Sequence, residues 1–125
     1  MITRIEALAD ALAYYHKSHE PDTIAYRNRN PGNLKAISFK NAKDAEGLRV
    51  FNSVLDGYQA LLFDLRIKCS GKSRAYRFDE NPTVESLMLA YGQGKPAAKY
   101  VAKQITKALN FEVRLDTPLG FFLEN

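Results

Sequence analysis

Four segments of this chain carry apolar residues at intervals of three and four positions, which is the spacing of one face of an α-helix. The spacing predicts a first helix from Thr3 to about His19 and a central helix between Ser53 and Gly71. Two further helices are expected at 84–91 and 97–109. Side chains suited to cap a helix stand at the starts of the first three segments, at Thr3, Ser53 and Thr83. The pattern therefore predicts a mostly helical protein.

The stretch between the first two helices has a different pattern. Pro21 should end the first helix, and residues 21–34 are rich in Pro, Asn, Asp and Gly, which is typical of a loop. Segments 36–40 and 47–51 are predicted to be short strands that a polar tip joins into a hairpin. We expect an α+β fold, mostly helical, with one small β-hairpin at its edge.

The whole chain, 1–125, is predicted to be a single domain, because it contains no internal repeat, low-complexity segment or linker. At this length a chain can bury roughly two-thirds of its unfolded surface. Eighteen Lys and Arg against fourteen Asp and Glu give a formal net charge of +4. This excess favours an anionic partner, which could be nucleic acid, a membrane surface or an acidic glycan.

Cysteine content and hydropathy limit the cellular context. Cys69 is the single cysteine and falls among apolar helix positions, so a buried thiol is expected. No apolar run is long enough to span a membrane. The N-terminal segment has Glu6 and Asp10 within its apolar part and no small-residue cleavage site, so it is not a signal peptide. We expect synthesis in the cytoplasm and another route of delivery if the protein acts outside it.

Glu20 is the first candidate for chemistry. On a helical wheel it falls about 60° from Ile5, at the edge of the apolar stripe. A carboxyl group that is poorly solvated there would have a raised pKa and could serve as a general acid. On pattern alone, a solvated glutamate at a helix end is the more common case.

Asparagines around Pro31-Gly32 form the second candidate. Asn28, Asn30 and Asn33 offer amide donors and acceptors that suit the hydroxyl and acetamido groups of a sugar. The same residue types also build turns for backbone reasons. We expect both roles, a rigid turn whose amides face a cleft.

Two other patterns are assigned to structure. His16 and His19 have helical spacing, but they lack the His-Glu-x-x-His order and a third ligand, so no metal or cofactor is predicted. A lysine row on the fourth helix could bind phosphates, but a solvated helix face is the usual explanation. No recognition-helix, RNA-binding or zinc-finger pattern accompanies this row, which comprises Lys95, Lys99, Lys103 and Lys107.

The order of these motifs resembles the lysozyme-like proteins of bacteriophages and bacteria that are related to lytic transglycosylases. The likeness runs over residues 5–109: a helix before Glu20, then Arg27-Asn28-Arg29-Asn30-Pro31-Gly32-Asn33-Leu34, a hairpin, and Asp56-Gly57-x-x-Ala60-Leu61-Leu62 on a helix. A later segment, Leu89-Ala90-Tyr91-Gly92-Gln93-Gly94, is similar to the Ala-Tyr-Asn-Ala-Gly motif that lines the substrate cleft in that superfamily.

The resemblance implies cleavage of the β-1,4 bond between N-acetylmuramic acid and N-acetylglucosamine in peptidoglycan, with Glu20 as the acid. It implies a glycan cleft lined by Asn30, Asn33, Tyr91 and Gln93. The lytic transglycosylase route, which needs one carboxyl group, is favoured over muramidase hydrolysis by inversion, which needs a second carboxylate across the cleft to activate water. Asp22, Asp44 and Glu46 are the nearby candidates for that carboxylate, and none of them has a motif around it. Glycan strands are the expected partner, and a phage particle is the expected context.

Two alternatives are kept. Pro21 stands where the family has Gly or Ser, and Gly92-Gln93 replaces Asn-Ala, so the second hypothesis is a non-catalytic virion or wall-binding protein with the same fold. The third is a small basic nucleic-acid-binding module that uses the lysine row, and specific nucleic-acid binding is not expected.

Overall fold

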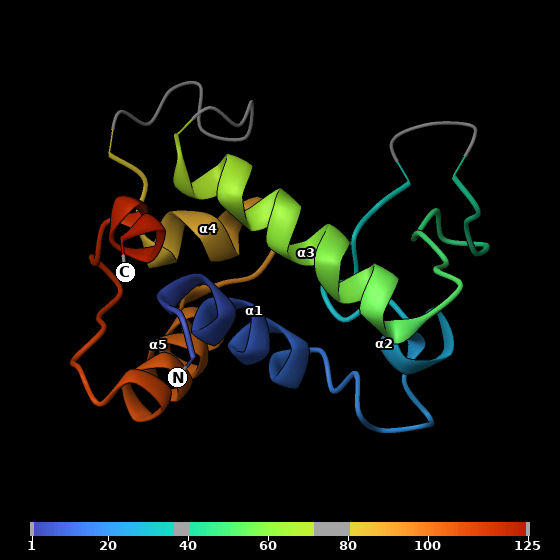
Figure 1. Cartoon of the computed structure of the whole chain (residues 1–125), viewed down its shortest axis with the longest axis horizontal. Helices are drawn as coiled ribbons and strands as arrows, with labels where there is room; N and C mark the ends of the chain where they lie inside the picture. Colours follow the sequence, from blue (N-terminus) through green and yellow to red (C-terminus); the bar gives the residue numbers. More distant parts are fainter. Residues whose placement is uncertain (1, 37–40, 72–80, 125) are drawn as a thin grey trace.

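The computed structural model describes residues 2–36, 41–71 and 81–124. In these ranges the chain forms helices joined by loops, and the described pairings between extended segments are isolated bridges (Figure 1). The prediction of a mostly helical protein is confirmed. The elements are α1 (Arg4–Tyr15), α2 (Ile24–Arg27), α3 (Val54–Cys69), α4 (Val84–Ala90), α5 (Lys95–Leu109) and the 3-10 helix η2 (Leu119–Leu123).

The core lies where α1, α3, α4, α5 and η2 meet. Figure 1 shows α1 between α3 and α5, and the fully buried side chains come from all of these elements. They include Leu8, Leu12, Leu61, Leu65, Leu87, Val101, Ile105 and Leu119. Cys69 is also buried, as predicted, and burial raises the pKa of its thiol to about 12, so the thiol is protonated at neutral pH.

Helix α1 begins where the sequence predicts and ends earlier. The Glu6 amide donates to Thr3 Oγ1 at 3.2 Å and the Thr3 amide donates to Glu6 Oε1 at 3.0 Å, so the predicted cap Thr3 forms a capping box with Glu6. The helix ends at Tyr15, and Lys17 takes a left-handed conformation with φ of 56°. The predicted end near His19 is therefore wrong, and Glu20 lies in a loop after the helix.

The loop after α1 is closed by Thr23. Its hydroxyl donates toward the carbonyl oxygens of Lys17 and Glu20 and accepts from the Tyr26 amide. The last of these bonds caps α2, a single turn that the sequence analysis missed within its predicted loop. A four-residue helix is too short to show apolar periodicity.

The described residues between α2 and α3, 28–36 and 41–53, lie at the end of α3 that is near α2 (Figure 1). The Ala36 amide donates to the Gly47 carbonyl at 2.9 Å and the Arg49 amide donates to the Leu34 carbonyl at 2.8 Å. Lys35 bridges Leu48, and no continuous strand forms within the described residues. The predicted hairpin is thus not shown, and residues 37–40 of its first strand lie outside the described residues.

The C-terminal third follows its local signals. Pro96 lies in the first turn of α5, and Asn110 ends the helix in a left-handed conformation with φ of 52°. Residues 111–115 form no strand, and Leu119–Leu123 form the 3-10 helix η2. The four lysines of the row on α5 are all exposed, which fits a solvated helix face. Within the described ranges, no helix combines the length and apolar character needed to cross a bilayer.

Candidate functional site

Hydrogen bonds of the Asn30 side chain to backbone atoms fix the Asn-Pro-Gly-Asn turn. This side chain is fully buried, and its Nδ2 donates to the carbonyl oxygens of Leu34 and Arg49, both at 2.9 Å. Its Oδ1 accepts from the Leu34 amide, also at 2.9 Å. All of its strong hydrogen-bonding capacity is used within the protein. The side-chain amide of Asn30 is therefore buried, bonded within the protein and not available to a ligand.

Two glycines allow this turn to lie directly on α3. A Cβ atom on Gly57 would lie 2.0 Å from the carbonyl oxygen of Arg29, and one on Gly32 would lie 2.6 Å from Cδ1 of Leu61. Both distances are shorter than real Cβ contacts allow. At Gly57 the obstacle is backbone, so only glycine fits there, whereas a side chain at Gly32 would require the Leu61 side chain to shift. The Asp56-Gly57 motif and the Asn-Pro-Gly-Asn motif are thus two sides of one packed contact.

His16 ties the end of α1 to the same turn. Its Nδ1 lies 3.1 Å from the carbonyl oxygen of Pro31, and a carbonyl can only accept, so Nδ1 carries the proton. Burial holds the pKa of His16 below its usual value, which keeps the ring neutral at pH 7. Across the described part of the chain, no three His, Cys, Asp or Glu side chains gather in a group that could hold a metal.

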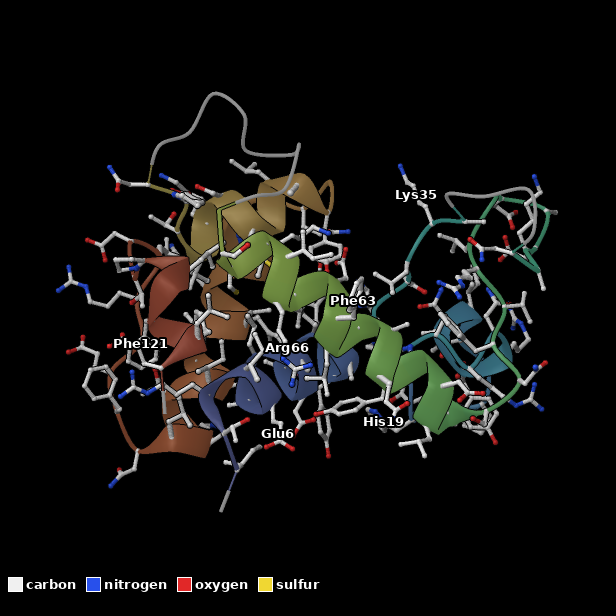
Figure 2. The ribbon with its side chains drawn as sticks, turned by 45° about the horizontal axis from the view of Figure 1, so that its top comes forward. Glu6, His19, Lys35, Phe63, Arg66 and Phe121 are labelled. Atoms are coloured by element: carbon white, nitrogen blue, oxygen red, sulfur yellow. The ribbon has the colours of Figure 1, made fainter. Side chains whose placement is uncertain are left out.

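A cavity of about 540 Å³ opens between this turn, α3 and the end of α4. Asn33, in the turn, lines this cavity. Tyr91, the C-cap residue of α4, lines it as well. Figure 2 shows Phe63 on α3 and Lys35 on the loop across from it, and both of these side chains also line the cavity. The structure thus brings together Asn33 and Tyr91, which are far apart in sequence.

A charged cluster occupies the wall of this cavity. The Tyr91 hydroxyl donates to Asp64 Oδ2 at 2.7 Å, and Lys68 Nζ donates to the same oxygen at 2.5 Å. Lys68 Nζ also lies 4.9 Å from the centroid of the Tyr91 ring. The cluster holds the Tyr91 ring in one orientation through a charge-assisted bond and a cation–π contact.

We expect Tyr91→Phe to lower the free energy of unfolding by about 1 kcal/mol, because it removes one hydrogen bond and leaves Asp64 paired with Lys68. Urea denaturation of both proteins measures this difference. The matched control is Tyr26→Phe, since Tyr26 is exposed and its hydroxyl has no partner among the described residues. Equal stability of the Tyr91→Phe variant and the wild type would show that the Tyr91–Asp64 bond contributes nothing.

Asn33 differs from Asn30 in how its polar atoms are used. Its φ of 48° lies in the left-handed region, which asparagine tolerates better than most residues. Its Oδ1 is buried and accepts no hydrogen bond from any described residue. An unsatisfied buried acceptor costs about 1–3 kcal/mol. The residue that carries this unsatisfied acceptor, Asn33, lines the cavity.

The other predicted site residues lie elsewhere. Glu20 does not line the cavity; its side chain is 46% exposed, and its Oε1 lies 4.0 Å from His19 Nε2. Figure 2 shows His19 and Lys35 on opposite sides of α3. Gln93 accepts a 2.9 Å hydrogen bond from the Tyr15 hydroxyl, which ties the α4–α5 turn to the end of α1.

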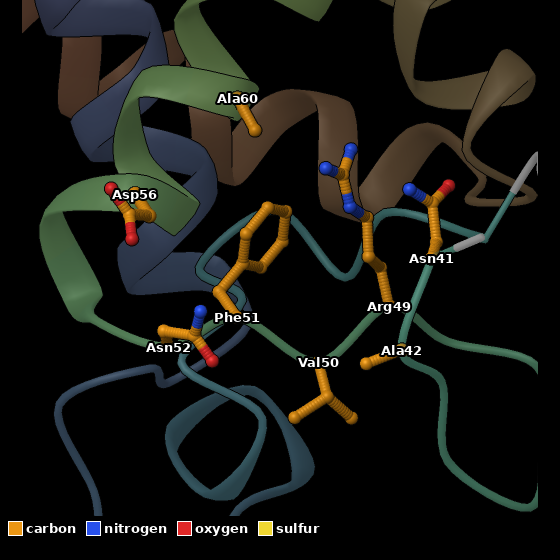
Figure 3. A pocket seen from close by; sticks show the side chains of 8 residues that line it. All are labelled: Asn41, Ala42, Arg49, Val50, Phe51, Asn52, Asp56 and Ala60. Carbon is orange, nitrogen blue, oxygen red and sulfur yellow. The ribbon is translucent and has the colours of Figure 1, made fainter.

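A second cavity, of about 470 Å³, lies next to the first and shares Arg49 with it. Figure 3 shows the Phe51 ring between the Arg49 side chain and Asp56. The Arg49 guanidinium carbon lies 4.6 Å from the centroid of that ring. Arg49 therefore stands at the junction of the two cavities.

Sequence reasoning missed Asp64, Lys68, Lys35 and Arg49 as residues of the site. The pair Asp64 and Lys68 has i,i+4 spacing, which is typical of any exposed helix face. No sequence signal separates this pair from a solvated one.

Comparison of the chain with protein-family models, with curated proteins and with solved structures gives no significant match.

Proposed function

We propose that this protein binds and cleaves the glycan strands of peptidoglycan, as a lysozyme-like protein related to the lytic transglycosylases. One observation carries the proposal: the Asn-Pro-Gly-Asn turn and the Ala90-Tyr91-Gly92 segment line the same cavity. These are the two segments on which the resemblance rests. Apolar and polar groups both line the cavity, as is usual in sites that bind small ligands or polymer segments.

Glu20 is the proposed acid. Its proton passes to the glycosidic oxygen as the bond to the anomeric carbon breaks through an oxocarbenium-like transition state. The resulting carboxylate then takes the proton of the sugar's own 6-hydroxyl as that oxygen attacks the anomeric carbon. The product is a 1,6-anhydro sugar, and the Glu20 carboxylic acid is regenerated without water or a cofactor.

The single-carboxylate route is supported by how Asp44 is used. An inverting hydrolase needs a second carboxylate free to activate water. Asp44 is instead occupied by hydrogen bonds from the Asn28 side chain at 2.8 Å and from the Glu46 and Leu48 amides. The bond from Asn28 holds the pKa of Asp44 below its usual value, as expected for a carboxylate that organises a loop.

Digestion of purified peptidoglycan followed by mass spectrometry tests the proposal. We expect soluble fragments that end in 1,6-anhydro-N-acetylmuramic acid. Fragments with reducing ends would reject the transglycosylase route in favour of muramidase hydrolysis. The absence of any soluble fragment would reject strand cleavage altogether.

The second candidate is a wall-binding or virion protein without catalytic activity. Its support is the position of Glu20, which is half-exposed and does not line the cavity that contains Asn33 and Tyr91. Co-sedimentation with insoluble peptidoglycan, measured together with release of fragments, separates the two candidates. Binding without release would favour this second function.

A further inference from the structure

The cavity that contains Asn33 and Tyr91 carries an excess of positive charge. Lys35, Arg49 and Lys68 line it against a single carboxylate, that of Asp64. Asp64 is paired with Lys68, and no described carboxylate lies within ion-pair distance of Lys35 or Arg49. Two positive charges on the lining are therefore unbalanced. A ligand with negative charge would satisfy them.

Arg49 is better ordered for this purpose than an ordinary surface arginine. Its backbone is held on both sides, because its amide donates to the Leu34 carbonyl and its carbonyl accepts from Asn30. Its guanidinium lies over the Phe51 ring. Such stacking leaves the edge of the guanidinium available for a planar, two-oxygen acceptor such as a carboxylate.

Beside the Asp64–Lys68 pair, the cavity is also lined by exposed apolar side chains. Phe63 is 66% exposed and Leu89 is 63% exposed, although both are large apolar side chains. Ile67 also lines the cavity and is 40% exposed. Apolar groups that gather at the wall of a cavity mark a binding surface more often than scattered ones do.

The polar groups argue against a neutral sugar ring as the occupant. The Asp64 carboxylate and the Tyr91 hydroxyl, which could bind sugar hydroxyls, are hydrogen-bonded to each other. The acceptor without a donor is Asn33 Oδ1, which is enclosed and would need the side-chain amide to turn toward the cavity. An amide N–H is a suitable donor for it.

We propose that this cavity binds a short acidic peptide, the peptide substituent of the glycan strand, and not the neutral sugar backbone. Carboxylates of the peptide pair with Lys35 and Arg49, its aliphatic side chains lie on Phe63 and Leu89, and an amide N–H reaches Asn33. This inference rests on the proposed function for the source of the peptide. Its chemistry rests on the cavity alone.

Isothermal titration calorimetry with three probes tests the inference. The probes are a muramyl peptide with free carboxylates, the same peptide with its carboxylates amidated, and a neutral chito-oligosaccharide. We expect the free-carboxylate peptide to bind at least about tenfold more tightly than either of the others, since a hydrogen bond to a charged group contributes about 1.5–3 kcal/mol. Its affinity should fall as salt concentration rises.

Substitutions of residues that line the cavity test whether the acidic peptide binds there. Arg49→Gln and Lys35→Gln should each weaken binding of the acidic peptide by about tenfold, while Arg49→Lys should lose less than Arg49→Gln. Lys95→Gln, on the exposed row of α5, is the matched control and should bind as the wild type does. Amide NMR shifts on titration should change at Asn33 and Tyr91, and thermal melting verifies that each variant is folded.

The outcomes separate this inference from the proposed function. Equal binding of all three probes, or full affinity in both glutamine variants, would overturn the inference. Strand cleavage with no affinity for the acidic peptide would overturn it while leaving the proposed function intact. Tight, carboxylate-dependent binding without strand cleavage would support the inference and reject the enzymatic function.

Discussion

Gly57→Ala is expected to destabilise the protein by about 3 kcal/mol or more, at the upper end of the range for overpacking. The new Cβ would lie 2.0 Å from the Arg29 carbonyl oxygen and 3.0 Å from Cδ of Pro31. The first obstacle is backbone, so no rotamer change can relieve the contact. The helix preference of Ala over Gly, about 1 kcal/mol, works in the other direction and is smaller.

Chemical and thermal denaturation of the Gly57→Ala variant measure this loss. The matched control is Gly120→Ala, because no atom lies within 4 Å of a Cβ built at Gly120 and its φ is not positive. That control should stay within about 0.5 kcal/mol of the wild type. Wild-type stability in Gly57→Ala would mean that α3 and the Asn-Pro-Gly-Asn turn are not in direct backbone contact.

Glu20→Gln is expected to lower the rate of glycan-strand cleavage by a factor of about 10²–10⁴, which is the usual contribution of a general acid. Glutamine has the same shape but cannot supply the proton. Folding should be unaffected, because the Glu20 side chain is half-exposed and its ion-pair contact is with His19 at 4.0 Å. The release of soluble fragments from peptidoglycan measures the rate.

Asp22→Asn provides the control for Glu20→Gln. Asp22 lies in the same loop, is exposed, and has an interaction through its backbone carbonyl, which accepts from Arg27. Its replacement should leave the rate unchanged. A fully active Glu20→Gln variant would remove Glu20 as the acid, and loss of activity in Asp64→Asn at unchanged stability would assign that role to the cavity carboxylate.

The helices that the sequence predicts correctly are those whose signals are local. Thr3 with Glu6, Ser53 and Thr83 cap their helices as expected, because capping needs only residues within one turn. The end of α1 was not predictable in this way. It depends on His16 bonding the Pro31 carbonyl and on Thr23 bonding the Lys17 carbonyl, and both contacts require the later loop to be in place.

The candidate site was predictable to a similar degree. The sequence pointed to Asn33 and Tyr91, and both line the cavity. It could not distinguish Asn30, buried with every strong bond satisfied, from Asn33, whose Oδ1 is unsatisfied, because both are asparagines beside the same Pro-Gly pair. The roles of Asp64 and Arg49 depend on where α4 and residues 34–36 and 41–51 lie relative to α3, and the spacing of residues along the sequence does not encode these positions.

The hydrogen bonds of Asn30 affect how readily substitutions could change which ligand this protein binds. Its bonds at Leu34 and Arg49 are to backbone atoms, so the spacing of the loop that carries Lys35 and Arg49 is set without using either of their side chains. Substitutions at these two positions could reverse or remove the charge offered to a ligand while the loop keeps its shape. Substitutions at these two positions can therefore change ligand specificity with little effect on folding.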